Sequence, residues 1–267
     1  MEHKIQGPRI VMIGAGHVAF HFANALHSKG YHIVQVYSRT IESAKALADL
    51  VQAEAITSIG AIDLTTDVFI FALNDNVLEE TIHRINFSGQ LALHTSGTLS
   101  IDIFKGKAEF YGVLYPLQTL SKFRKVNMQE IPLLIEANSS KELSNLKLLA
   151  QAISARVMIT DSLQRRKIHL AAIFASNFAN HMYVIADELM KKSGFSYELL
   201  KPLILETALK AVECGNPMAA QTGPAVRLNK SVVEKHREML ASNSDLQNIY
   251  TSISNHIALM HHNSPII

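Results

Sequence analysis

The segment 14–19, Gly-Ala-Gly-His-Val-Ala, constrains the fold more than any other part of the chain. It follows an apolar run over 9–13 and opens a stretch with helical character over 17–29. In this spacing the first glycine permits a tight turn, the second lets the backbone approach a pyrophosphate, and the final alanine keeps the helix against the strand. The helix N-terminus then faces the phosphates. We therefore expect a dinucleotide to contact Gly14, Ala15, Gly16, His17 and Val18.

Short apolar strands alternate with helical segments over the first 160 residues. Continuous apolar runs, such as 68–73, are typical of strands that are buried on both faces. Strands separated by helices imply right-handed parallel crossovers. The pattern predicts an α/β domain over 1–160, a doubly wound Rossmann-type sheet. The expected strands are 9–13, 32–37, 53–56, 68–73, 90–95, 109–114, 131–136 and 156–159, and the expected helices are 17–29, 41–51, 77–85 and 141–153.

The pattern changes near Asp161, after which no convincing strand occurs. We expect an all-α C-terminal domain over 161–267, with helices at 162–192, 197–213, 231–241 and 245–261. The first of these is long and apolar around much of its circumference, which is typical of a helix covered by other helices or by a second subunit. Roughly 75 further residues are too few to cover it, so we expect a homodimer through this helical domain.

The end of the second expected strand favours NADP over NAD. An NAD site usually offers a carboxylate there to the ribose 2′-hydroxyl. This chain has Ser38, Arg39 and Thr40 instead, and its first carboxylate is Glu42. Arg39 can pair with a 2′-phosphate, and the two hydroxyl groups can donate hydrogen bonds to it. The alternative is that Arg39 is a solvated loop residue.

Two later loops lie at the carboxyl ends of strands, the edge of the sheet where ligands bind in such folds. One contains Leu73, Asn74 and Asp75, and the other spans 94–97. We expect the first loop and Thr95 to border the nicotinamide half of the cofactor. Asp75 can equally cap the following helix. Two residues of the second loop are candidates for the substrate: His94 for binding, and Ser96 for catalysis or, equally, for satisfying the turn.

Composition argues against several other classes of protein. The chain has 25 Lys and Arg against 23 Asp and Glu, and the basic residues are scattered, unlike the concentrated basic face of a nucleic-acid binder. The most apolar stretch, 168–190, carries too many polar residues for a membrane span. The 13 histidines form no cluster with ligand spacing, so we expect no metal site. A single cysteine, Cys214, and the absence of a signal peptide at the start favour the cytoplasm.

These motifs together resemble a family of Rossmann-type NADP oxidoreductases whose helical C-terminal domain has no known function. The family is related in architecture to pyrroline-5-carboxylate reductase, ketopantoate reductase and the 6-phosphogluconate dehydrogenase superfamily. The resemblance spans essentially the whole chain and implies a helical domain like the C-terminal domain of 6-phosphogluconate dehydrogenase. The residues that carry it are 14–19, 73–75, 94–97, Tyr-Pro-Leu-Gln-Thr at 115–119, 166–172 with Asn177, 222–224 with Arg227, and His236.

The long helix of this chain carries the candidate catalytic residues. Arg166, His169, Ile173 and Asn177 follow one another at steps of three, four and four, which places them on one stripe. His169 can exchange a proton with a carbonyl or imine, and Asn177 can hold the substrate oxygen or nitrogen. Arg227 can bind a substrate carboxylate or phosphate. The alternative is a core histidine that is satisfied by a backbone carbonyl.

One departure from the related hydroxyacid dehydrogenases and ketopantoate reductase bears on the reaction. Those enzymes place a lysine four residues before a key asparagine on this helix, whereas Ile173 lies four residues before Asn177 here. The resemblance and the residues thus imply an NADP-dependent oxidoreductase that transfers a hydride between NADP(H) and a small carbonyl or imine substrate in the interdomain cleft. The alternatives are a non-catalytic NADP-binding sensor or partner protein, and a binder of a nucleotide sugar or another phosphate ligand.

Overall fold

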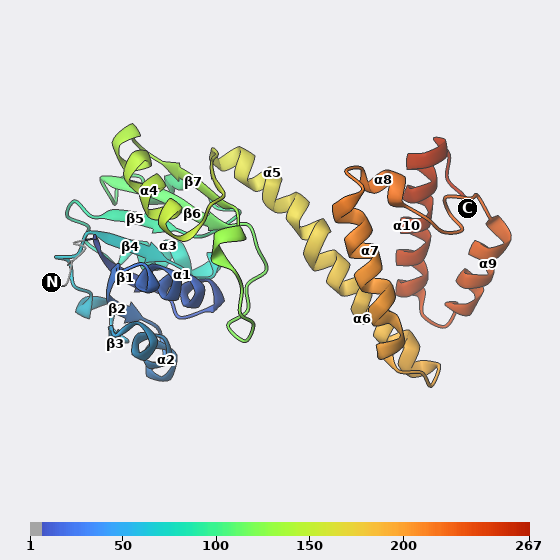
Figure 1. The fold of residues 1–267 in the computed structure, drawn as a ribbon, viewed down its shortest axis with the longest axis horizontal. Helices are drawn as coiled ribbons and strands as arrows, with labels where there is room; N and C mark the ends of the chain where they lie inside the picture. The colour runs from blue at the N-terminus through green and yellow to red at the C-terminus, as the bar shows by residue number, and fades with distance from the viewer. Residues whose placement is uncertain (1–6) are drawn as a thin grey trace. The chain divides into compact units, whose positions relative to one another are not determined.

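The structure, a computed structural model, describes residues 7–267 and divides into two compact units. The first unit ends at Met182, and the second spans Tyr183–Ile267. The first is an α/β unit and the second is built from helices (Figure 1). The last strand ends at Ile159, just before the point where the sequence pattern changes.

Within the described residues, eight strands form one sheet in the order β3-β2-β1-β4-β5-β6-β7-β8. The strand order reverses between β1 and β4, which creates the crevice at the carboxyl ends of the strands where ligands bind in doubly wound sheets. The strands are β1 Arg9–Ile13, β2 His32–Tyr37, β3 Glu54–Ile56, β4 Val68–Phe71, β5 Leu91–His94, β6 Phe110–Pro116, β7 Leu133–Ala137 and β8 Val157–Ile159.

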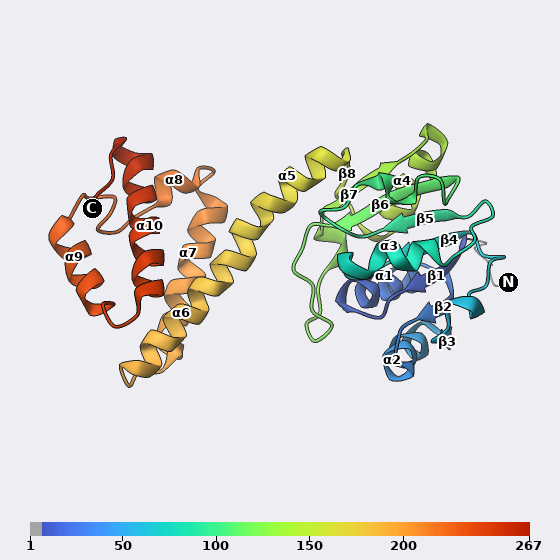
Figure 2. The ribbon, with the colours of Figure 1, turned by 180° about the vertical axis from the view of Figure 1, so that it is seen from behind.

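Helices cover both faces of this sheet (Figures 1 and 2). Ile10 and Met12 of β1 pack in one apolar cluster with α1, α2 and α4, whereas Val11 and Ile13 pack in another with α3 and the short helix η2. This alternation follows from the two-residue period of a strand. The helices of this unit are α1 His17–Ser28, α2 Ile41–Val51, α3 Asp75–His83, α4 Ser140–Ile153 and α5 Ser162–Ala172, with the short 3-10 helices η1 Ile59–Ala61, η2 Ile101–Phe104 and η3 Met128–Glu130.

The prediction of parallel crossovers is correct for most strand pairs and wrong for one. Strands β6 and β7 pair in antiparallel fashion, whereas the other neighbouring pairs, including β7 with β8, are parallel. The connection between β6 and β7 contains only the one-turn helix η3. Parallel strands are usually joined through an α-helix that crosses one face of the sheet, and this connection contains none, so the chain returns in the opposite direction.

The expected continuous helix over 162–192 is interrupted by a π-helical segment. The chain runs through α5, then the π-helical segment η4 (Ile173–Phe178), and then α6 (Ala179–Lys192). A π-helix has wider turns with bonds from i to i+5, so the expected stripe of side chains does not continue unchanged through this segment. Short π-helical segments occur frequently at functional sites, and this one contains Asn177.

The second unit begins within α6 and has a small core. Val233, Ala258 and Ile266 are its buried cluster, packed with Tyr250 and Ile267. Its further elements are the 3-10 helix η5 Tyr197–Leu200, α7 Lys201–Glu213, α8 Pro217–Ala220, α9 Lys230–Met239 and α10 Ser244–His262. Among residues 7–267, no helix has the length and apolar character that crossing a membrane requires.

Candidate functional site

The glycine turn after β1 opens onto a cavity of about 410 Å³. Gly14 has φ +119°, and a Cβ there would lie 2.3 Å from the backbone oxygen of Ala72, so only glycine fits this turn. Gly16 is the N-cap of α1 and has no atom within 4 Å of where a Cβ would lie. The first intrahelical bond of α1 runs from Phe20 N to Gly16 O (3.0 Å), so the N–H groups of residues 17–19 have no acceptor within the helix and can bind a ligand. This turn therefore fits a dinucleotide pyrophosphate.

The end of β2 borders the same cavity. Ser38 and Arg39 line it, together with Ser43 from the first turn of α2. Arg39 is exposed and forms no ion pair with any residue of the described chain. Thr40 does not line the cavity, because it is the N-cap residue of α2 and its hydroxyl donates to Ser43 Oγ (2.9 Å). Two serine hydroxyl groups and an unpaired guanidinium are suitable partners for a 2′-phosphate.

The structure brings only part of the expected cofactor set to this cavity. Of that set, the lining residues are Gly14, Ala15, Gly16, Ser38, Arg39, Leu73 and Asn74. Asn74 is the N-cap residue of α3, so the interpretation of Asp75 as the cap is wrong. Asp75 accepts a hydrogen bond from the Thr98 hydroxyl. Thr95 is buried, and its backbone N–H and hydroxyl both bond to Phe71 O.

The remaining two residues of the expected set belong to the start of α1 and do not line the cavity. His17 Nδ1 accepts a hydrogen bond from Lys122 N (3.1 Å), which ties α1 to the β6–β7 connection. Val18 packs against the core cluster that includes α1. Residues of α3 complete the cavity wall. They were not identified from the sequence, because no local motif in this helix indicates that it faces the cavity. These are Val77, Glu80, Thr81 and the C-cap residue Arg84.

The loop after β5 is held by its own side chains. Ser96 is buried, and its hydroxyl oxygen accepts hydrogen bonds from the backbone N–H groups of Thr98 and Leu99, both at 3.1 Å. The Ser96 N–H donates to His94 Nδ1 at 3.1 Å. This geometry favours the turn-forming role of Ser96 over direct contact with a substrate.

His94 is fully buried, which conflicts with its expected role in binding a substrate. Its ring stacks on Phe104 with centroids 5.8 Å apart, and Phe104 belongs to the apolar cluster that includes Val11 and Ile13. Burial lowers the pKa of His94 to about 3, and the positive charge of Arg165 contributes to the shift. The ring is therefore neutral at physiological pH and supports the loop instead of facing a ligand.

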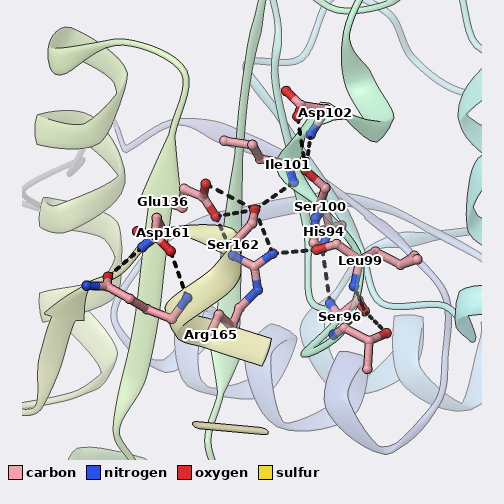
Figure 3. Close-up of polar contacts among 12 residues, drawn as sticks. His94, Ser96, Leu99, Ser100, Ile101, Asp102, Glu136, Asp161, Ser162 and Arg165 are labelled. Carbon is pink, nitrogen blue, oxygen red and sulfur yellow. Dashed lines mark hydrogen bonds and ion pairs between the residues drawn. The ribbon is translucent and has the colours of Figure 1, made fainter. Parts of the chain in front are cut away.

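A buried arginine fastens the start of α5 to the sheet (Figure 3). Arg165 is 0% exposed and pairs with the carboxylate of Glu136 on β7, while its Nη2 donates to Leu99 O. Ser162 Oγ donates to the same carboxylate (2.9 Å) and accepts from Ile101 N (3.1 Å). Asp161 caps the helix in a reciprocal pair with Gln164. The expected stripe began at Arg166, which is exposed; the residue that contacts the protein interior is its neighbour Arg165.

His169 lies one turn beyond Arg165 and meets a tyrosine from β6. Tyr115 Oη lies 2.8 Å from His169 Nδ1, and the two rings pack edge to face with centroids 5.7 Å apart. A Cβ at Gly97 would lie 2.6 Å from His169 Nδ1 and 3.0 Å from Tyr115 Cζ, so the loop after β5 contacts both rings. This site thus combines the carboxyl ends of β5 and β6 with α5. The sequence indicated its histidine but not its tyrosine.

Two other expected site residues are exposed. Asn177 is exposed within η4, and its Oδ1 accepts from Ser176 Oγ at 3.1 Å. Arg227 belongs to the second unit, where it is exposed and forms no ion pair with the described residues. No group of three or more His, Cys, Asp or Glu side chains converges on a metal-binding position anywhere in 7–267.

Two family profiles match this chain. The profile of shikimate and quinate 5-dehydrogenases matches residues 1–103, and that of a domain of unknown function, DUF2520, matches residues 131–257. No protein of curated function matches.

Solved structures match over nearly the whole chain. A Bacteroides fragilis protein described as a "putative NADP oxidoreductase" is 43% identical, with 94% of this chain and 98% of that one covered and a TM-score of 0.89. A reductive aminase from Aspergillus terreus, solved with NADPH and ethyl-5-oxohexanoate, is 13% identical, with 98% and 97% covered and a TM-score of 0.72. A pyrroline-5-carboxylate reductase from Coxiella burnetii is 17% identical, with 96% and 98% covered and a TM-score of 0.56. The last two similarities show a shared fold.

The buried His94 predicts a specific dependence of stability on pH. Its pKa is about 3 in the folded protein against 6.5 for an ordinary histidine, so between these values the unfolded chain binds the extra proton. The stability that this residue contributes is present above about pH 6.5 and is lost as the pH falls toward 3, by about 1.4 kcal/mol per pH unit. The His94→Asn variant retains an acceptor for Ser96 N–H. In urea unfolding, its free energy of unfolding is expected to fall less steeply between pH 6.5 and 4.5 than that of the native chain. Plotted against pH, the free energies of unfolding of the two proteins should run parallel above pH 7. Parallel curves over the whole pH range would contradict the lowered pKa of His94.

Proposed function

This chain belongs to the family of two-domain oxidoreductases that the Bacteroides fragilis protein represents, and we propose that it is an NADP-dependent oxidoreductase. It combines a Rossmann-type NAD(P)-binding domain with a DUF2520 helical domain. The observation that carries the proposal is the cavity at the glycine turn. Its phosphate end offers backbone N–H groups, two serine hydroxyl groups and Arg39, and no carboxylate from the end of β2. We assign NADP binding to residues 1–160, and substrate binding and dimerisation to residues 161–267.

The residues around the cavity fit NADP part by part. The turn 14–16 and the start of α1 would hold the pyrophosphate. Ser38, Arg39 and Ser43 would hold the 2′-phosphate, with Arg84 on the opposite wall adding positive charge. Arg84 lies 4.0 Å from Glu80, and both side chains are largely exposed. Because such an exposed ion pair is weak, the Arg84 guanidinium remains available to a phosphate. Leu73 and Asn74 would border the nicotinamide half.

Bound NADPH would supply a hydride, and the protein would supply the matching proton. We propose His169 as the residue that exchanges this proton with a small carbonyl or imine substrate. Asn177 and Arg227 are the proposed ligands of the substrate, Asn177 for its oxygen or nitrogen and Arg227 for a carboxylate or phosphate. Because Ile173 stands where related dehydrogenases carry a lysine, the reaction would not use a lysine acid. His94 and Ser96 would act indirectly, by shaping the loop that contacts His169.

We further propose that the protein works in the cytoplasm as a homodimer assembled through its helical domain. Helix α7 supports the dimer, because none of its 13 residues is buried in the single chain. Leu203 and Leu205 are 63% and 61% exposed, and Val212 is 82% exposed. Burying side chains of this size stabilises an interface by up to about 1.5–3 kcal/mol each. Packing of this surface against a second copy of the chain would therefore stabilise a dimer. The single cysteine, Cys214, is exposed and free, which suits a reducing compartment.

Calorimetric titration with NADPH and, separately, NADH tests the cofactor assignment. We expect micromolar affinity for NADPH and much weaker affinity for NADH. Arg39→Ala removes the cation that pairs with the 2′-phosphate and should lower NADPH affinity about 10-fold to 100-fold, with little effect on NADH. Lys45→Ala is the matched control, since this exposed lysine of α2 does not line the cavity. A well-folded native protein that binds neither dinucleotide would refute the proposal and favour another phosphate ligand.

Sedimentation equilibrium at micromolar concentration tests the dimer. The native chain is expected to have the mass of two copies of 29.5 kDa. A Leu205→Glu/Val212→Glu double variant places two charges on one exposed face of α7, because residues seven apart share a helix face, and should shift the protein to the monomer while NADPH binding persists. Strictly monomeric native protein would contradict this part of the proposal.

A further inference from the structure

The hydrogen bond between Tyr115 and His169 determines which ring nitrogen of His169 carries a proton. We propose that Tyr115 donates its hydroxyl hydrogen to His169 Nδ1, which fixes the histidine in the tautomer that carries its proton on Nε2 and so presents that proton to the substrate. This inference rests on the proposed function and identifies Tyr115 as a positioning residue that acts through His169.

The chemistry of the two groups sets the direction of this hydrogen bond. A contact of 2.8 Å between Tyr115 Oη and Nδ1 needs one hydrogen, from either partner. A phenol is a stronger acid than a neutral imidazole N–H, and an imidazole nitrogen is a better acceptor than a phenol oxygen. The hydrogen therefore belongs to Tyr115. The Nε2 of His169 has no hydrogen-bond partner in residues 7–267, so its proton remains available to a ligand.

The surroundings hold both rings in place. Tyr115 and His169 are half-buried, and Gly97 brings the backbone of the loop after β5 against both of them. Arg165, four residues before His169, fixes the start of α5 by its bonds to Glu136 and Leu99 O. Burial raises the pKa of Tyr115, against a smaller opposite effect of the positive charge of Arg165, so the phenol is protonated at neutral pH and available as a donor.

This arrangement balances the proton in a reduction. As the substrate C=O or C=N bond becomes a single bond, its oxygen or nitrogen takes the proton from His169 Nε2. The hydroxyl proton of Tyr115 moves to Nδ1 at the same time, so the imidazole remains neutral. Water then returns a proton to Nε2, and the proton on Nδ1 moves back to the phenolate, which restores the starting tautomer. A neutral imidazole alone would have to become an anion to release its proton, and transfer from Tyr115 replaces that anion with a phenolate, which is the weaker base.

Nitrogen-15 NMR of the histidine side chains tests the inference without a substrate. Spectra are recorded on the free protein at about pH 9, well above the ordinary pKa of histidine. His169→Asn identifies the His169 signals among the 13 histidines. In the native chain, Nδ1 is expected at the pyridine-type position and Nε2 at the pyrrole-type position. In Tyr115→Phe the two shifts should move toward each other, because the donor that selects one tautomer is gone.

The chain offers a matched control in a second tyrosine–histidine pair. Tyr250 Oη lies 2.8 Å from His236 Nδ1, with ring centroids also 5.7 Å apart, in the second unit. Tyr250→Phe should change the His236 signals and leave those of His169 unchanged. A native His169 that carries its proton on Nδ1, or a His169 whose shifts are the same in Tyr115→Phe, would overturn the inference.

NADPH titration of the same samples separates this inference from the proposed function. Tyr115→Phe lies outside the cavity at the glycine turn and should retain native NADPH affinity. The inference is supported if Tyr115→Phe binds NADPH as the native chain does but no longer favours the His169 tautomer with its proton on Nε2. Native NADPH binding with an unselected tautomer refutes the inference alone, whereas a selected tautomer without any NADPH binding refutes the proposed function alone.

Discussion

The buried ion pair between Arg165 and Glu136 is the interaction on which the candidate site depends. Arg165 has no exposed surface, and Glu136 is 15% exposed, so the pair joins the first turn of α5 to the edge of β7 in a region of low dielectric. Removing one partner of such a pair typically costs about 3–5 kcal/mol, because the other charge is left buried alone. The same guanidinium contacts Leu99 O in the chain that follows β5. One side chain thus fixes both the helix that carries His169 and the segment beside it.

From this anchor the first unit brings together two sets of groups at the carboxyl edge of its sheet. The ends of β1, β2 and β4 form the dinucleotide cavity, and the ends of β5 and β6 meet α5 at Tyr115 and His169. Parallel pairing of these strands is what places both sets on one edge. The proposed cofactor binding and the proposed proton transfer then need only the sheet and the start of one helix. The π-helical segment carrying Asn177 follows directly and adds a residue with an exposed amide.

Local patterns in the sequence predict the parts of the molecule that local interactions decide. The glycine turn, the buried strands, the helices of the first 160 residues to within about two residues, and Arg39 at the end of β2 follow from turn geometry, hydrophobic period and charge. The antiparallel β7 was missed because the expectation assumed a parallel crossover between all strands, whereas the connection between β6 and β7 holds no α-helix. The π-helical segment was missed because its residues have an ordinary helical pattern.

The details of the site depend on contacts between distant residues, and these are not visible in a single sequence. Tyr115 and His169 are 54 residues apart, and nothing in the local sequence of β6 indicates that its tyrosine meets α5. Arg165 and Arg166 are adjacent and chemically identical, so only the rotation of α5 against β7 decides which one is buried. His94 was expected at a ligand because it precedes a loop, but its side chain is fully buried and packs on Phe104.

A crystal structure of the complex with NADP⁺ tests the central claim most directly. We expect the pyrophosphate over residues 14–16 at the start of α1 and the 2′-phosphate against Ser38 and Arg39. The nicotinamide ring should lie at the ends of β4 and β5, within reach of a small substrate that contacts His169. A dinucleotide bound elsewhere, or one whose nicotinamide lies on the far side of the sheet from Tyr115 and His169, would contradict it.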